Sequence, residues 1–260
     1  MLEQFDAERP IVGMVHLPPL PGAPGFDDRA AVVDRARSDA EALLDGGVDG
    51  LLVENYGDAP YYPESVPKHV VASMTAVTRA VVEMADVPVG VNVLRNDAEA
   101  AVSVAGAADG SFIRVNVHTG GRLTDQGVLS GRAHETIRLR DRIAPSVDVL
   151  ADVAVKHSSA IADRSLETMV SDTVERGLAD GIVVSGSTTG ETAPTDIVET
   201  VAKHAGGTPV FVGSGVTPAN VGSLLDIADG VIVGTALKRD DETDAPVDRA
   251  AVKRLLDASR

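Results

Sequence analysis

The amino-acid sequence predicts an eight-stranded α/β barrel of the TIM-barrel kind, a single domain formed by residues 1–260. Eight short apolar segments alternate with eight segments of helical pattern, and no segment is left over. Continuous apolar strands joined by helices are typical of a parallel sheet that is buried on both faces. An open doubly wound sheet would need a dinucleotide-binding glycine motif early in the chain, and none occurs there.

Each expected strand is a short run of apolar residues. The eight strands are expected at residues 11–17, 51–55, 89–94, 112–118, 149–156, 181–185, 209–212 and 230–233. Helices are expected at about residues 27–44, 67–84, 97–105, 133–143, 165–176, 195–204 and 247–258, with one more, a short helix, after strand 209–212.

Local signals define several of the helix ends. Asp27 or Asp28 can cap the first helix, and the pair Gly46 and Gly47 stops it. In the short helix after strand 209–212, Thr217 is the expected N-cap, and Pro218 fits the first helical position. The long connection 119–131 is rich in glycine and is expected to be a loop.

The composition excludes several classes of partner. A formal net charge of −16 disfavours binding to nucleic acid or to an anionic membrane surface. An acidic chain with few lysines is also what a protein adapted to concentrated salt would carry, because salt screens the repulsion between its charges. The absence of cysteine excludes disulfides. With no signal segment and no long apolar run, the protein is expected to be cytoplasmic and not inserted in a membrane.

The stretch 209–238 predicts a phosphate site. Its two strands are separated by one helix, so both glycine-containing ends should emerge at the same edge of the sheet. In α/β barrels the loops after strands seven and eight are the usual phosphate site. The expected phosphate-binding residues come from three strand ends: Gly186, Ser187, Gly213, Ser214, Gly215, Gly234 and Thr235. Lys238 is a candidate to add positive charge to this site. The alternative interpretation of the whole stretch is that it contains two ordinary glycine turns and no phosphate site.

Polar residues at the other strand ends are candidates for catalysis, because catalytic groups of this fold lie at the carboxyl ends of the strands. They are His16, Glu54, Asn92, Asn116, His118 and Lys156. Glu54 is the best candidate for a general base among the carboxylates, since it ends a buried strand. Lys156 is a candidate base or Schiff-base amine, and a simple contact to phosphate or carboxylate is the alternative.

Strand 112–118 alternates polar and apolar residues. Arg114, Asn116 and His118 therefore share one face, which should point into the barrel. Asp152 on the next strand would need a partner when buried, so a structural Arg114–Asp152 pair is expected. No cofactor is predicted. A divalent metal stays open, although the spacing of His16, Glu54, His118 and His157 matches no zinc signature.

Five motifs resemble the BtpA family, which includes SgcQ-like proteins. They are IVGMVHLPPLPGAPGF at 11–26, LLVENYGDAPYY at 51–62, GVNVLRND at 90–97, FIRVNVHTG at 112–120 and ADVAVKHS at 151–158. The resemblance implies a TIM barrel of the ribulose-phosphate-binding type. The family takes its name from a cyanobacterial factor needed for photosystem I accumulation, and the SgcQ-like relatives resemble members of sugar-metabolism gene sets.

Two functions are compatible with these features. The first is an enzyme that acts on a phosphorylated sugar or similar small metabolite, by isomerase, epimerase or lyase chemistry. The second is a non-catalytic biogenesis or stability factor for a membrane complex, with the loops 18–26 and 56–63 as a docking surface or, alternatively, as lids of the barrel. The expected partner of the enzyme is a phosphorylated small-molecule ligand. A homo-oligomer stays open.

Overall fold

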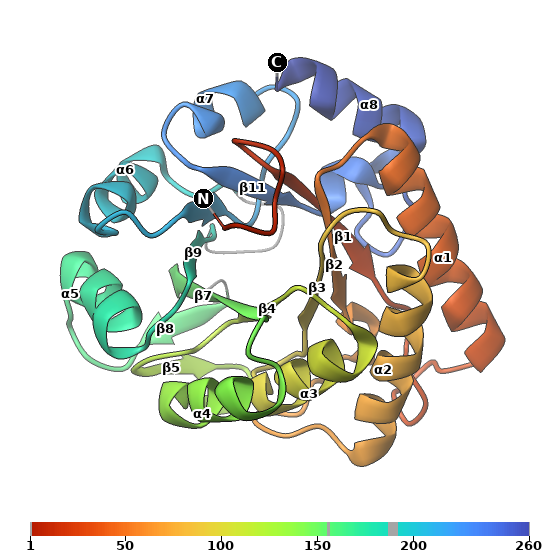
Figure 1. Ribbon diagram of the computed structural model, residues 1–260, viewed down its shortest axis with the longest axis horizontal. Helices are drawn as coiled ribbons and strands as arrows, with labels where there is room; N and C mark the ends of the chain where they lie inside the picture. The colour runs from red at the N-terminus through yellow and green to blue at the C-terminus, as the bar shows by residue number, and fades with distance from the viewer. Residues whose placement is uncertain (1, 155–156, 187–191, 260) are drawn as a thin grey trace.

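A closed barrel of eight parallel strands, surrounded by helices, forms the protein, as predicted (Figure 1). The structure is a computed structural model that describes residues 2–154, 157–186 and 192–259. The barrel strands are β1 (Ile11–His16), β2 (Gly50–Glu54), β3 (Val89–Asn92), β4 (Phe112–Val115), β7 (Asp148–Ala154), β9 (Gly181–Val184), β10 (Val210–Val212) and β11 (Gly230–Val233). They follow one another around the barrel in this order, and β11 pairs with β1.

The helices cover the outside of the barrel (Figure 1). They are α1 (Arg29–Gly46), α2 (Lys68–Val82), α3 (Ala98–Ala108), α4 (Ala133–Ile143), α5 (Leu166–Ser171), α6 (Thr195–His204), α7 (Val221–Leu225) and α8 (Arg249–Ala258). Short 3₁₀ turns are η1 (Tyr56–Asp58), η3 (Thr235–Leu237) and η4 (Arg239–Asp241), and the π-helical turn η2 (Asp172–Arg176) extends α5. No helix in the described part of the chain is long and apolar enough to cross a membrane.

The ends of α1 follow the sequence signals. Asp28 is its N-cap, because its side chain accepts a hydrogen bond from the backbone N–H of Ala31 at 2.9 Å. Gly47 ends the helix in a left-handed conformation with φ of 96°, which favours glycine.

Aromatic side chains close the amino-terminal end of the barrel. Phe112 and Phe211 are fully buried there, and Phe5 of the N-terminal segment packs on both rings, with centroids at 5.7 and 6.2 Å. Gly90 provides the space, because a β-carbon at that position would lie 2.2 Å from Phe112 Cε2. With this end filled, the polar strand ends at the opposite, carboxyl edge form the mouth.

Two segments differ from the prediction. The connection 119–131 is not only a loop: β5 (Gly121–Thr124) and β6 (Gly127–Ser130) form a hairpin, and β8 (Ser158–Ala160) joins them in a three-stranded sheet, called here the small sheet. The helix after β10 begins at Val221 and not at Pro218. Asn220 is its N-cap, and the Asn220 side chain accepts a hydrogen bond from the N–H of Thr217 at 2.7 Å, so Thr217 is held in the preceding turn.

Candidate active site at the carboxyl end of the barrel

Four polar residues form a row across four neighbouring strands. The strand register pairs His16 with Glu54, Glu54 with Asn92, and Asn92 with Arg114. Partners in a parallel pair project to the same face, so the row lines the inside of the barrel at its mouth. The side-chain amide of Asn92 donates a hydrogen bond to Glu54 Oε2 at 2.7 Å, and His16 Nε2 lies 3.7 Å from Glu54 Oε1. The row places a buried carboxylate between an amide donor and an imidazole.

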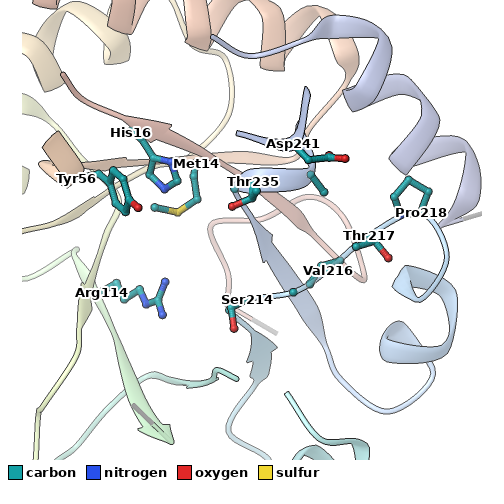
Figure 2. A pocket seen from close by; sticks show the side chains of 14 residues that line it. Met14, His16, Tyr56, Arg114, Ser214, Val216, Thr217, Pro218, Thr235 and Asp241 are labelled. Atoms are coloured by element: carbon teal, nitrogen blue, oxygen red, sulfur yellow. The ribbon is translucent and has the colours of Figure 1, made fainter. Parts of the chain in front are cut away.

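A cavity of about 330 Å³, called here the glycine cavity, opens beside this row (Figure 2). Backbone from the ends of β10 and β11 forms one wall, with Gly213, Ser214, Gly215, Gly234 and Thr235. His16 and Tyr56 form the other wall. The guanidinium of Arg114 points into the cavity from β4 (Figure 2). These five predicted phosphate-binding residues are therefore together around one cavity.

His16 connects the glycine cavity to Glu54. A β-carbon placed on Gly234 would lie 2.9 Å from His16 Cε1, so the imidazole packs directly on this glycine. The same ring stacks on Tyr56 with centroids 4.7 Å apart. A ligand group in the glycine cavity would therefore be one side chain away from the Glu54 carboxylate.

A second cavity of about 340 Å³ adjoins the first at Tyr56 and reaches Glu54 from the other side. It is called here the tyrosine cavity, and Tyr61 and the buried Arg95 line it together with Asp125 and His157. The Tyr61 hydroxyl donates a hydrogen bond to the backbone oxygen of Tyr56 at 2.7 Å. Burial, reinforced by nearby acidic groups including Glu54, raises the pKa of both tyrosines, so both stay protonated donors at neutral pH.

The predicted Arg114–Asp152 pair is confirmed. Arg114 donates from Nε and Nη2 to the two carboxylate oxygens, each at 2.8 Å, and both side chains are almost fully buried. Nη2 also donates to Ser185 Oγ at 3.1 Å, and Asn116 donates to Asp152 Oδ2 at 3.3 Å. The pair joins three strands under the mouth.

The remaining predicted residues lie in different places. Gly186 is buried, and its N–H donates to Ser214 Oγ at 2.8 Å. Lys156 and Ser187 lie outside the described residues. Lys238 does not line the glycine cavity: its ammonium is fully buried and lies 3.3 Å from the Asp39 carboxylate, a contact that no sequence pattern predicted.

His118 does not join the row on strand β4, contrary to the face expected from the alternating pattern. The strand ends at Val115, and the chain beyond it turns toward η2. There His118 Nε2 hydrogen-bonds to the backbone oxygen of Gly177 at 2.8 Å. Burial lowers the pKa of His118, so the ring is neutral at pH 7.

Tyr56, Tyr61 and Arg95 were not predicted as site residues, although the segment 56–63 was expected to be a lid of the barrel or a docking surface. One signal was available for the tyrosines: the chain contains three, and all of them lie in the segment 56–62 directly after the strand that ends in Glu54. Arg95 carried no comparable signal, because it follows the end of β3 in a turn. In the described part of the chain, no group of three or more His, Asp or Glu is arranged to hold a metal ion.

Fold and mouth together define a TIM barrel with a polar site at the carboxyl ends of its strands. Solved structures with this arrangement include N-(5'-phosphoribosyl)anthranilate isomerase from Pyrococcus furiosus, with a TM-score of 0.59 at 12% identity over 96% of this chain and 98% of that one. A structure titled "Native KDPGal structure" also has a TM-score of 0.59, at 15% identity over 98% and 96%. At these identities the likeness shows the fold alone.

The sequence profile of the BtpA family matches residues 7–260, and the chain belongs to this family. It is 43% identical to the photosystem I biogenesis protein BtpA of Synechocystis over 99% of this chain and 90% of that protein. An uncharacterised protein of Pyrococcus furiosus is 44% identical over 96% and 94%. The putative sgc region protein SgcQ of Escherichia coli is 32% identical over 98% and 96%.

Proposed function

We propose that the protein is an enzyme that acts on a phosphorylated sugar or a similar small phosphorylated metabolite, by isomerase, epimerase or lyase chemistry. The observation that carries the proposal is the contact of one imidazole with both parts of the site. His16 packs on Gly234 of the glycine cavity and lies 3.7 Å from the Glu54 carboxylate.

The phosphate group would occupy the glycine cavity. Backbone from two strand ends lines it, and glycine lets that backbone approach an oxyanion closely. The side chains of Ser214 and Thr235 add hydroxyl groups at the same wall. The Arg114 guanidinium contributes positive charge, which Asp152 partly offsets.

Glu54 would act as the general base next to a carbonyl of the substrate. Glu54 Oε2 accepts a hydrogen bond from Asn92, and Oε1 is the oxygen that lies near His16. A proton taken by Glu54 from carbon leaves an enolate oxygen, and His16 or a tyrosine hydroxyl could donate to it. This proton transfer is the first step common to isomerisation and epimerisation, and a retro-aldol lyase would use a base at the substrate hydroxyl.

Proton exchange with solvent tests this proposal. A panel of pentose and hexose phosphates is incubated with the protein in deuterated water, and deuterium incorporation at carbon is followed by proton NMR. Exchange is expected for at least one member of the panel, and Glu54→Gln should slow it by about 10²–10⁴-fold, the usual contribution of a general base.

Glu83→Gln is the matched control, because Glu83 is an exposed glutamate at the C-cap of α2, where it pairs with Arg79. The control should exchange at the wild-type rate. An absence of both exchange and binding across the panel would remove the proposal.

A second candidate is a biogenesis factor for a membrane complex, supported by the 43% identity to the Synechocystis protein of that name. Exposed apolar side chains on the small sheet also favour an interaction role: Leu123 and Val128 are register partners, and each is more than half exposed. Complementation of a cyanobacterial strain that lacks its own BtpA separates the candidates. A scaffold keeps its cellular role with Glu54→Gln, whereas an enzyme loses it.

A further inference from the structure

A third cavity, of about 200 Å³, lies between the ends of β4 and β7, the small sheet and the segment of α5 and η2. Asn116, Asp152, Arg122 and Arg164 are its charged or amide-bearing lining residues, so we call it the arginine cavity. The arginine cavity and the glycine cavity share no lining residue in the described part of the chain. Arg114 lines the glycine cavity, and its ion-pair partner Asp152 lines the arginine cavity.

Arg122 is a partly buried cation without a carboxylate partner in the described ranges. Its Nε donates to Ser158 Oγ at 2.6 Å and its Nη2 to the Ser158 backbone oxygen at 3.4 Å. Burial alone lowers the pKa of this guanidinium, with no acidic group raising it. Arg164, by contrast, is paired with Asp172. Removing a guanidinium from water without an opposing charge costs free energy of folding, and a bound anion would offset that cost.

Asn116 lines the same cavity and has a buried amide oxygen without a hydrogen-bond partner among the described residues. Its Nδ2 donates to Asp152 Oδ2 at 3.3 Å, and this bond fixes which side of the amide carries oxygen. The Oδ1 atom on the other side is buried and has no hydrogen-bond partner among the described residues. A ligand that satisfies it must carry a donor, such as a hydroxyl group.

We infer that the arginine cavity binds a small hydroxylated anion, whose phosphate or carboxylate pairs with Arg122 and whose hydroxyl donates to Asn116 Oδ1. The Asp152 carboxylate does not oppose such a ligand, because Arg114 already neutralises it through two hydrogen bonds. The inference does not rest on the proposed function, because it uses neither Glu54 nor the glycine-containing wall of the glycine cavity, and Arg114 enters only as the ion-pair partner of Asp152.

Isothermal titration calorimetry with glycerol 3-phosphate tests this site at fixed ionic strength. Arg122→Gln should weaken one class of binding at least tenfold, because the glutamine can keep a hydrogen bond to Ser158 but carries no charge. Arg138→Gln is the matched control, since Arg138 is exposed on α4 and donates to its own helix backbone. Ala160→Leu narrows the cavity from β8 without removing a hydrogen bond and should have the same effect as Arg122→Gln.

The outcomes separate this inference from the proposed function. If Arg122→Gln and Ala160→Leu bind glycerol 3-phosphate as Arg138→Gln does, the inference is wrong, even where binding at the glycine cavity remains. If binding of glycerol 3-phosphate depends on Arg122 while no sugar phosphate of the panel either exchanges protons or binds, the inference stands and the proposed function falls. Methyl phosphate, which lacks hydroxyl donors, should bind at least fivefold more weakly at this site, and equal affinity would remove the role of Asn116.

Discussion

Replacement of Arg114 by methionine removes the cation at the centre of the barrel and leaves the Asp152 carboxylate buried. The two side chains are 1% and 0% exposed, and the variant loses both 2.8 Å hydrogen bonds to Asp152. The carboxylate then keeps the 3.3 Å bond from Asn116. Breaking a buried ion pair on one side costs about 3–5 kcal/mol. At about 2–4 °C per kcal/mol for a domain of this size, the melting temperature should fall by roughly 6–20 °C.

Urea denaturation followed by circular dichroism measures this loss, with the salt concentration held constant. Arg249→Met is the control, because Arg249 pairs with Asp45 at the surface with both side chains about half exposed, and the midpoint should change little. The double replacement Arg114→Met with Asp152→Leu should regain most of the lost stability, since no buried charge remains. A loss below about 1 kcal/mol for Arg114→Met would refute the reasoning.

Three further predictions concern other parts of the fold. Gly234→Ala should displace His16, because the new β-carbon would lie 2.9 Å from its ring, and should slow proton exchange at least tenfold while the circular dichroism spectrum is unchanged. Burial and a neighbouring carboxylate raise the pKa of Asp148 to about 6, so the folded state holds a proton that the unfolded state has released, and this contribution is lost as pH rises through 6. Asp148→Asn should therefore raise the melting temperature relative to wild type at pH 8 but not at pH 4, and an equal change at both values would contradict the assignment. Lys238→Met should destabilise the protein by about 1.5–3 kcal/mol, the usual contribution of a hydrogen bond to a charged group, because Arg35 Nε at 3.0 Å and the Val247 N–H at 2.8 Å still donate to the buried Asp39 carboxylate. Phosphate affinity should stay unchanged, and the reverse pattern would restore a role for this lysine in the site.

The barrel could be predicted because its strands and helices alternate without a gap, and the buried pair Arg114–Asp152 followed from the period of two along neighbouring strands. The row of polar residues was harder to foresee. Strand ends identified His16, Glu54 and Asn92 separately, but only the register between strands places them side by side.

The two misplaced residues have different physical causes, and the first is that the pattern of a strand does not reveal where the strand ends. His118 continues the alternation of β4 in sequence, yet the chain leaves the barrel after Val115, and the ring contacts Gly177. The second cause is a contact between residues far apart in the sequence. Lys238 follows the loop that was expected to bind phosphate, but its ammonium lies against the buried Asp39 of α1, 199 positions away in the sequence. Contacts of this range cannot be inferred from local patterns.

The central claim, a phosphate held opposite Glu54, is tested most directly by a crystal structure with D-ribulose 5-phosphate bound. The account predicts phosphate density in the glycine cavity, about 2.7–3.2 Å from backbone N–H groups of the Ser214–Gly215 and Gly234–Thr235 segments, with the sugar carbons directed past His16 toward Glu54. Phosphate density on the far rim of the barrel, or an empty glycine cavity at saturating ligand, would contradict it.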